Sequence, residues 1–315
     1  MKDKLNILVT GGAGFIGSNI VDKYIDMGHR VWVLDNLSSG DIKNINPSAE
    51  FIEKDILSKD LDALFEKVKF DIVNHHAAQI NIRKSVSDPM FDAGINILGT
   101  INILENIKKH KIKKIIFSSS GGAIYGESEF PNKERDFVNP ISPYGIAKLS
   151  DEFYIKFYAK TYGFNYLIFR YSNVYGPRQS IKGEAGVVAI FFDNFIKNIP
   201  SIIFGSGEQK RDFVFVKDVA LINSLALDFP ENITINVSSG NDIKILDLYK
   251  LEKEISKSDL EVKFLPKRLG EIENSLVDNS LMKKVFKIEL TSLKKGLEET
   301  FNFYNNKYSK NLDFF

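Results

Sequence analysis

A tyrosine and a lysine, Tyr144 and Lys148, stand four residues apart in a segment with a helical pattern. Residues at this spacing lie on one face of a helix, one turn apart. A lysine ammonium beside a phenol favours the phenolate, so such a tyrosine can act as a general base although the usual pKa of a phenol is about 10. The pair predicts proton exchange with a hydroxyl group of a substrate.

Sequence context distinguishes this pair from a second one. Tyr249 and Lys253 have the same spacing, and there we expect a solvent-exposed helix face. Upstream of Tyr144, in contrast, the three serines 118–120 end a predicted strand. A serine hydroxyl at that strand end can hydrogen-bond the same substrate oxygen. We therefore interpret the first pair and one of the serines as a catalytic group.

A glycine-rich segment follows the first predicted strand, and a helical pattern opens inside it. Its sequence, Thr10-Gly-Gly-Ala-Gly-Phe-Ile-Gly17, fits both G-x-G-x-x-G and T-G-x-x-G-x-x-G. Glycines let the chain turn tightly and bring backbone N–H groups against a pyrophosphate at the positive end of a helix. The segment predicts a dinucleotide-binding loop made of Gly11, Gly14, Phe15, Ile16 and Gly17.

An acidic residue, Asp35, ends the second predicted strand. A carboxylate at this position accepts hydrogen bonds from an adenosine ribose and repels a 2′-phosphate, so the sequence predicts NAD rather than NADP. We include the neighbouring Asn36 in this site. Asp55 and Ile56 follow the third predicted strand, where the carboxylate accepts from the adenine amino group or caps a helix N-terminus. Both interpretations of Asp55 stay open.

The elements that must position these residues follow a βαβ pattern. Short β-rich apolar runs alternate with longer amphipathic stretches, which is typical of a parallel sheet buried on both faces. The sequence predicts an α/β fold, a Rossmann-type doubly wound sheet with a smaller discontinuous lobe. We expect strands at Leu5–Thr10, Val31–Leu34, Glu50–Lys54, Ile72–His75, Lys114–Ser118 and Tyr166–Arg170, and helices at Ile16–Met27, Asp60–Val68, Met90–Lys109 and Tyr144–Tyr162.

The regularity breaks after Asn173, where glycine and proline interrupt the chain. A strand end and helix at 212–227 and a strand at 233–237 return to the sheet. We therefore predict a cofactor-binding domain of residues 1–174 plus 212–242 and a substrate-binding lobe of residues 175–211 plus 243–315. The crevice between them is the expected ligand site.

Composition narrows the class of protein. The 315 residues carry 42 Lys and Arg against 41 Asp and Glu, for a net charge of +1, so we expect neither a nucleic-acid nor a membrane partner. The sequence has no cysteine, which removes disulfides, thiolate metal sites and cysteine nucleophiles and favours a cytoplasmic location. Its longest apolar run falls far short of the ~18 residues of a membrane helix. His75 and His76 are neighbours at a strand end and point opposite ways, so we expect no metal site.

Further motifs continue these signals along nearly the whole chain. Together with the features above, they make the sequence closely similar to the extended short-chain dehydrogenase/reductase family, and within it to the sugar-nucleotide 4-epimerases. The motifs are His76-Ala-Ala-Gln79, Asn96-Ile-Leu-Gly-Thr100, Tyr125-Gly126, Arg170-Tyr-Ser-Asn-Val-Tyr-Gly-Pro-Arg178, Gly205-Ser-Gly-Glu-Gln-Lys-Arg-Asp212 and Pro266-Lys-Arg-Leu-Gly-Glu271.

The resemblance implies that the protein interconverts UDP-glucose and UDP-galactose through a 4-keto sugar, with tightly held NAD and no net redox change. It adds three residues to the cofactor site, Ala77, Gln79 and Asn96, beside Tyr144 and Lys148. It also implies a substrate site in which Arg211 and Arg268 offer forked donors to the diphosphate. The other residues of that site are Asn173, the uracil-facing backbone of Gly186, Val187 and Val188, and Glu271 at the nucleotide ribose.

One departure from the family concerns the serines. Many members place three residues between the catalytic Ser or Thr and the Tyr-Gly pair, whereas here Gly121-Gly-Ala-Ile124 makes four. Either Ser120 is the catalytic hydroxyl and the extra glycine loops out, or Ser119 takes its place. We favour Ser120.

A single residue predicts the size of the sugar. By its distance from Glu271, Ser275 matches the family position that borders the substituent on carbon 2 of the hexose, where a tyrosine fills the space. A serine leaves room for an N-acetyl group, so we expect UDP-N-acetylglucosamine as well as UDP-glucose to be substrates. The alternative is a loop serine that caps a turn.

Other activities and the assembly also follow from the resemblance. A UDP-glucuronate 4-epimerase, or another NAD-dependent oxidoreductase of sugar nucleotides, shares nearly all these motifs and remains an alternative. Dehydratases and decarboxylases of the family carry carboxylates where this chain has Gly121-Gly-Ala-Ile124, so we do not expect their chemistry. An inactive NAD-sensing scaffold would have lost the Tyr-Lys pair. The resemblance also implies a homodimer, paired through the helices Met90–Lys109 and Tyr144–Tyr162.

Overall fold

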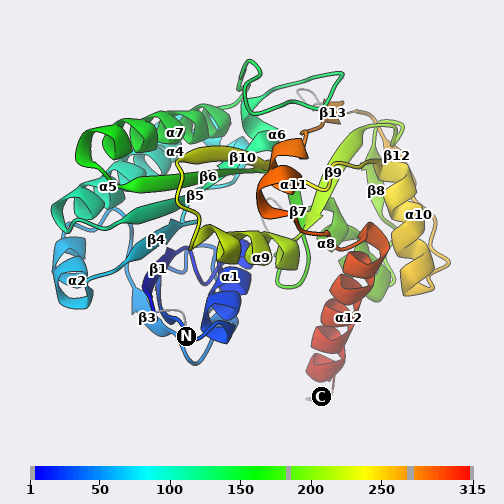
Figure 1. Ribbon diagram of the computed structural model, residues 1–315. Coiled ribbons are helices and arrows are strands. Elements are labelled where there is room, and N and C mark those ends of the chain that lie inside the picture. The colour runs from blue at the N-terminus through cyan, green and yellow to red at the C-terminus, as the bar shows by residue number, and fades with distance from the viewer. Residues whose placement is uncertain (1–3, 182–185, 268–272, 313–315) are drawn as a thin grey trace.

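The structure is a computed structural model that describes residues 4–181, 186–267 and 273–312 (Figure 1). A seven-stranded parallel sheet forms its centre, in the order β10-β6-β5-β4-β1-β2-β3. The order reverses between β1 and β4, which is the point where doubly wound sheets bind their ligands. The predicted fold class is confirmed. The strands are β1 (Asn6–Thr10), β2 (Arg30–Asp35), β3 (Glu50–Glu53), β4 (Ile72–His75), β5 (Lys114–Ser120), β6 (Asn165–Tyr171) and β10 (Ile233–Val237).

Helices cover both faces of this sheet. Successive side chains of a strand point to opposite faces, so Ile7 and Val9 of β1 join one apolar core while Leu8 joins the other. The first core is closed by α1 (Phe15–Asp26), α9 (Val216–Ala226) and α11 (Ser280–Phe286), the second by α2 (Leu61–Val68), α5 (Gly99–Lys109) and α7 (Pro143–Tyr162).

Local sequence signals set the bounds of α7, the helix that carries the Tyr-Lys pair. At its start the Ser142 hydroxyl accepts a hydrogen bond from the Gly145 N–H at 3.1 Å, and Pro143 occupies the first turn. At its end Gly163 has a φ of 76°, a conformation that glycine adopts without strain. The helix predicted at Met90–Lys109 is α4 (Pro89–Ala93) and α5, joined by a π-helical stretch, Gly94–Leu98.

A smaller lobe packs beside the sheet (Figure 1). In one of its sheets β9 lies between β11 and β13 and also pairs with β7, while β8 and β12 form a second sheet. Its own apolar core is rich in phenylalanine. The lobe elements are β7 (Asn173–Tyr175), α8 (Val187–Ile196), β8 (Ile202–Phe204), β9 (Lys210–Phe215), β11 (Asp242–Lys244), α10 (Ile245–Ser256), β12 (Lys263–Leu265), β13 (Asn274–Ser275) and α12 (Leu293–Leu312).

The predicted division into domains stays a prediction, and the packing bears on one boundary. The sequence assigns residues 243–315 to the lobe, yet Met282 of α11 is fully buried in the core beneath the large sheet. The remaining short helices are α3 (Ile82–Ser87), α6 (Gly121–Ile124) and a 3-10 turn, Ile42–Asn44.

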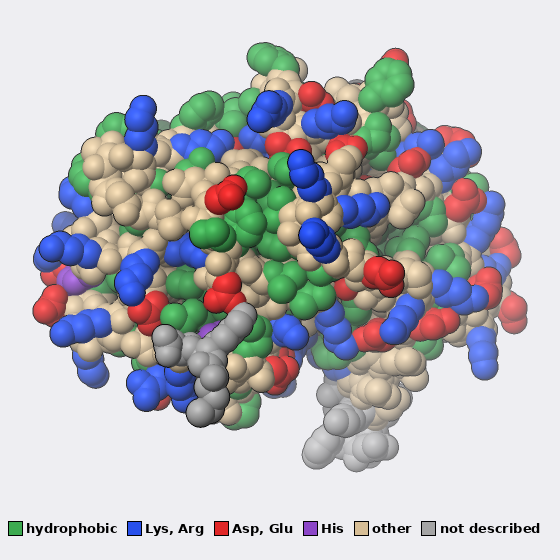
Figure 2. Space-filling view, viewed as in Figure 1, with side chains coloured by type: hydrophobic (Ala, Val, Ile, Leu, Met, Phe, Trp, Pro, Cys, Tyr) green, Lys and Arg blue, Asp and Glu red, His purple; other side chains and the backbone are tan. Residues whose placement is uncertain are grey.

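The surface mixes charges of both signs. Figure 2 shows lysine and arginine interspersed with aspartate and glutamate over the face in view, in keeping with the net charge of +1. Within the described ranges, no helix has both the length and the apolar character needed to cross a bilayer.

Candidate active site

The glycine-rich segment is the turn between β1 and α1. Gly14 is the N-cap of α1, and in the described chain no side chain caps this helix start and no acidic residue stands in its first turn. The backbone N–H groups there are therefore open to an anion, at the positive end of the helix dipole. This arrangement fits the pyrophosphate of a dinucleotide.

Two glycines of the loop are required by close packing. Gly11 has a φ of +69°, and a Cβ atom on it would lie 2.6 Å from the backbone nitrogen of Ala77. A Cβ atom on Gly17 would lie 2.3 Å from the Gly11 carbonyl oxygen. The loop, the start of α1 and the turn after β4 therefore meet backbone against backbone, which only glycine allows.

Asp35 lies where β2 ends, against the glycine loop. Its carboxylate is 7% exposed and accepts hydrogen bonds from the N–H groups of Ala13, at 3.0 Å, and Leu37, at 2.9 Å. Burial raises the pKa of this carboxyl, and the two N–H groups oppose the shift. A carboxylate fixed in this way fits the ribose hydroxyls of NAD.

The structure excludes one of the two interpretations of Asp55, the helix cap. Its carboxylate does not cap a helix, since α2 begins after Asp60. It accepts from the Leu57 N–H at 2.8 Å, within a turn, and from the Asn36 side-chain amide at 2.7 Å. Ile56, beside it, is buried against Gly99 of α5. Asp55 thus links the ends of β2 and β3 on the side predicted for the adenine.

Asn96 fixes the loop that follows β4. Its side chain accepts from the Gln79 N–H at 2.8 Å and donates to the Gln79 carbonyl at 3.0 Å. Asp92, buried on α4, accepts from the side chains of both residues, at 2.7 Å from Gln79 and 3.1 Å from Asn96. The π-helical stretch turns Asn96 toward this loop. Sequence reasoning missed Asp92.

The structure brings the three predicted catalytic residues together. The Tyr144 hydroxyl forms a side-chain hydrogen bond with Ser120. Lys148 is buried, donates to the Ser118 carbonyl at 2.9 Å, and has its Nζ atom 6.0 Å from the centre of the Tyr144 ring. Proton donors and acceptors thus converge at the end of β5, beside the switch point of the sheet.

The electrostatics of this group are dominated by burial. Burial raises the pKa of Tyr144 well above its usual value; Asp92 and Asp151 raise it further, and the hydrogen bond with Ser120 lowers it. Burial lowers the pKa of Lys148, while the same two carboxylates oppose that shift. Asp151, one turn after Lys148, was missed from the sequence, and burial raises its pKa to about 8.

Ser119 points away from the catalytic group. It is buried and donates to Glu152 at 2.7 Å, so its hydroxyl lies on the opposite side of β5 from that of Ser120. The expectation of a looped-out glycine is wrong: residues 121–124 form the short helix α6, and Ser120 is its N-cap. A helical turn absorbs the additional residue.

A cavity of about 750 Å³ opens in the lobe. Asn173 and Arg211 line it together with the start of α8, Gly186 to Val188. The Arg211 guanidinium donates to two backbone carbonyls at 2.8 Å, which fixes its direction. All five residues were predicted to meet the UDP moiety, and they share this cavity. Two other predicted residues, Arg268 and Glu271, lie outside the described residues.

Ser275 lies beside Arg211, which lines the cavity, and near the catalytic Ser120. It pairs with Arg211 in the small sheet. A Cβ atom on Gly122 would lie 3.5 Å from the Ser275 hydroxyl oxygen and 4.0 Å from that of Ser120. Both serine hydroxyls therefore face the same small space.

The second tyrosine–lysine pair is not a solvent-exposed face, so that expectation is wrong. Tyr249 is 2% exposed in the lobe core, where its hydroxyl donates to the Leu260 carbonyl at 2.7 Å. Lys253 forms a surface ion pair with Glu261 instead.

The neighbouring histidines point apart. The His75 ring bonds to the hydroxyls of Thr10 and Thr100, whereas His76 stacks on Tyr171. Within the described residues, no three His, Cys, Asp or Glu side chains form a group that could hold a metal ion.

The sheet order, the glycine loop and the Tyr-Lys-Ser group together define a Rossmann-fold enzyme of the short-chain dehydrogenase/reductase class. The sequence pattern of the NAD dependent epimerase/dehydratase family matches residues 7–238. The chain belongs to this family.

Individual relatives are similar over nearly their full length. A putative UDP-glucose 4-epimerase of Methanocaldococcus jannaschii is 48% identical over 305 residues, which cover 95% of this chain and 98% of the relative. The crystal structure of a Thermotoga maritima UDP-glucose 4-epimerase with UDP-glucose is 44% identical, has a TM-score of 0.94, and the match covers 96% of this chain and 100% of that one. A Methanobrevibacter ruminantium UDP-N-acetylglucosamine 4-epimerase in complex with UDP-N-acetylmuramic acid is 36% identical, with a TM-score of 0.92 and coverage of 97% and 99%.

Proposed function

We propose that the protein is a sugar-nucleotide 4-epimerase that interconverts UDP-glucose and UDP-galactose, and also accepts UDP-N-acetylglucosamine, through a 4-keto sugar. The observation that carries the proposal is the position of Ser275. Its hydroxyl and that of Ser120, which bonds to Tyr144, face one small space, and Ser275 pairs with Arg211, which lines the lobe cavity.

The cofactor site of this proposal is the switch point of the large sheet. The start of α1 holds the pyrophosphate and Asp35 holds the adenosine ribose. The hydrogen-bonded side chains of Asn36 and Asp55 lie on the adenine side. The loop fixed by Asn96 lies between them and the Tyr-Lys pair. When bound in its oxidised form, NAD would supply the hydride acceptor for carbon 4 of the hexose.

The residues of the chain handle the proton. Tyr144 takes the proton of the 4-hydroxyl group as the C–H bond at carbon 4 breaks, and returns it when the sugar is reduced again. Ser120 donates a hydrogen bond to the same oxygen. Lys148 keeps a positive charge beside the tyrosine, held in direction by the Ser118 carbonyl. Because burial raises the pKa of Tyr144, the proton transfer depends on the positive charge of the nearby Lys148.

The sugar must present both faces of carbon 4 during one cycle. The residues around the space are small, since Gly122 and Ser275 line it beside Ser120. A 4-keto sugar held through its diphosphate can therefore turn without displacing side chains. The stretch Gly121-Gly-Ala-Ile124 also has no carboxylate for the further chemistry of a dehydratase or decarboxylase.

The same proposal includes a homodimer. Large apolar side chains are exposed on α4, on the π-helical stretch Gly94–Leu98 and on α7. Their exposed fractions are 86% for Met90, 58% for Leu98, 63% for Phe153 and 58% for Phe157. Exposed apolar side chains on elements that contact one another favour burial against a second copy. Sedimentation of the purified protein tests this dimer, and Phe157→Asp should shift the protein to the monomer.

The cytoplasmic location stays a prediction.

The activity is tested by incubation of the purified protein with UDP-glucose, UDP-N-acetylglucosamine and UDP-glucuronate in separate reactions without added NAD. Chromatography of the products should show the 4-epimers of the first two. Turnover of UDP-glucuronate alone would assign the other predicted activity. Accumulation of NADH in solution would indicate an ordinary dehydrogenase and overturn the proposal.

A further inference from the structure

A row of buried polar side chains crosses the large sheet directly behind the catalytic serine. Ser119, Arg170 and Asn236 are direct neighbours in register on β5, β6 and β10. Lateral neighbours in a sheet point to the same face, so the three form one line. All three are at most 4% exposed. None of them touches the cofactor or substrate sites of the proposed function.

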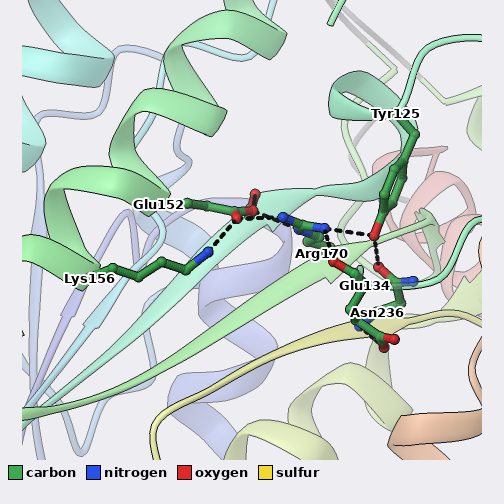
Figure 3. Close-up of polar contacts among 7 residues, drawn as sticks. Tyr125, Glu134, Glu152, Lys156, Arg170 and Asn236 are labelled. Atoms are coloured by element: carbon green, nitrogen blue, oxygen red, sulfur yellow. Dashed lines mark hydrogen bonds and ion pairs between the residues drawn. The ribbon is translucent and has the colours of Figure 1, made fainter. Parts of the chain in front are cut away.

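Helix α7 and the segment after α6 complete the row (Figure 3). Arg170 donates to both Glu152 oxygens, at 2.9 and 2.7 Å, and to the Tyr125 hydroxyl at 2.7 Å. Tyr125 in turn donates to the Asn236 side-chain oxygen at 2.8 Å. Burial raises the pKa of Glu152, but the guanidinium outweighs it, so the net pKa is lowered and the pair is ionised.

The far end of the row holds the segment that carries Ser275. The Asn236 amide donates to the carbonyls of Asn132, at 2.9 Å, and Asp278, at 3.2 Å. Asn132 also bonds to this segment, because its N–H donates to the Leu276 carbonyl at 3.1 Å and its carbonyl accepts from the Asp278 N–H at 2.9 Å. The polar row thus runs without a break from the strand of Ser120 to the strand of Ser275.

We propose that Tyr125 and Asn236 are positioning residues that set the width of the sugar space, by fixing the Ser275 segment relative to the Ser120 strand. This inference rests on the proposed function. Both serine hydroxyls face Gly122, one from each wall, so a shift of either wall changes the room beside carbon 2 of the hexose. The row therefore acts on the discrimination between sugars rather than on the proton transfer.

The chemistry of the row makes Tyr125 the residue to change. Removal of Arg170 would leave the buried Glu152 with only Lys156, at 3.3 Å, as a cationic partner, and breaking a buried ion pair is strongly destabilising. Tyr125→Phe removes one hydroxyl, and Arg170 keeps Glu152 and the Glu134 carbonyl, at 3.2 Å, as acceptors. The change therefore loosens the link to Asn236 while the ion pair stays intact.

Tyr249→Phe is the matched control. Tyr249 is buried to the same degree as Tyr125 and likewise loses one hydroxyl donor, here to the Leu260 carbonyl, but it lies in the lobe core away from the row. Both variants should lose a similar amount of thermal stability and keep bound NAD. A merely structural role of Tyr125 predicts the same kinetics for both.

The experiment measures kcat and KM of the wild type and both variants for UDP-glucose and UDP-N-acetylglucosamine. For Tyr125→Phe we expect KM for the acetylated sugar to rise at least fivefold, a smaller rise for UDP-glucose, and kcat within threefold of wild type for both, since the acetyl group lies against the loosened wall. Asn132→Ala, which removes one side-chain bond to the Leu276 carbonyl, should shift KM in the same direction by less.

Amide hydrogen exchange gives a readout besides activity. It still tests the inference, through Asn132→Ala, in the case that Tyr125→Phe folds poorly. Exchange at Asn132 and Asp278 should quicken in the Tyr125→Phe and Asn132→Ala variants and stay unchanged in Tyr249→Phe. Equal KM ratios and equal exchange in all variants would overturn the inference while leaving the proposed function intact. Absence of turnover by the wild type would instead contradict the proposed function.

Discussion

Gly17→Ala tests whether the turn between β1 and α1 is the NAD site. The added methyl group would lie 2.3 Å from the Gly11 carbonyl oxygen and 2.9 Å from the Gly11 carbonyl carbon and the Gly12 Cα atom. Ordinary van der Waals contacts begin at 3.4 Å. The start of α1 must therefore move by about 1 Å from the loop, because the obstructing atoms are backbone atoms that have no other rotamer.

The magnitude follows from the cost of overfilling a packed site, about 1 to 3 kcal/mol. The upper end applies here because no side chain can yield. About 3 kcal/mol corresponds to a loss of roughly a hundredfold in NAD affinity, since 1.4 kcal/mol is tenfold. The displaced N–H groups also no longer converge on the pyrophosphate.

The assay is equilibrium dialysis of stripped protein against NAD, with urea denaturation to follow stability. Gly94→Ala is the matched control. Gly94 has a helical φ of −57°, and a Cβ atom on it would meet nothing within 4 Å, so NAD affinity should stay unchanged and stability should rise slightly. If Gly17→Ala bound NAD as tightly as Gly94→Ala, the assignment of the loop would be refuted.

Three further outcomes are expected. Tyr144→Phe should lower kcat by about two to four orders of magnitude and leave NAD binding intact, whereas Tyr249→Phe should keep kcat; the reverse result would place the catalytic helix elsewhere. Ser275→Tyr should abolish turnover of UDP-N-acetylglucosamine and spare UDP-glucose, because overfilling the space beside carbon 2 costs about 1 to 3 kcal/mol. Equal loss of both activities would show that Ser275 does not determine the size of the sugar. Burial lowers the pKa of His75 to about 3, so below pH 6.5 only the unfolded chain binds its proton, and the free energy of unfolding should fall by about 2 kcal/mol between pH 6.5 and 5. In His75→Gln urea melts this part of the loss should be absent.

The features that the sequence predicted well are local ones. The glycine loop, Asp35 and the Tyr144–Lys148 pair depend on spacings within one strand, turn or helix, and the structure places them beside the carboxyl ends of β1, β2 and β5, on either side of the switch point. The same holds for the alternating strands and helices, because a sheet buried on both faces requires continuous apolar runs.

The features that the sequence did not predict depend on register and packing between distant segments. Ser119, Arg170 and Asn236 form a row only because three strands pair in one register, which no spacing along the chain encodes. The buried position of Tyr249 likewise depends on α8, which packs Phe191 and Phe195 against its ring. An i, i+4 pattern does not tell which element covers that helix face.

The central claim, epimerisation by removal and return of the same hydrogen, is tested most directly with UDP-glucose that carries deuterium on carbon 4. The reaction runs in ordinary water without added NAD, and mass spectrometry follows the label in the UDP-galactose formed. The account predicts that the deuterium stays on carbon 4, because it leaves and returns within one closed site, while Tyr144 exchanges only the proton of the hydroxyl group. Loss of the deuterium to solvent, with protium on carbon 4 of the product, would contradict it.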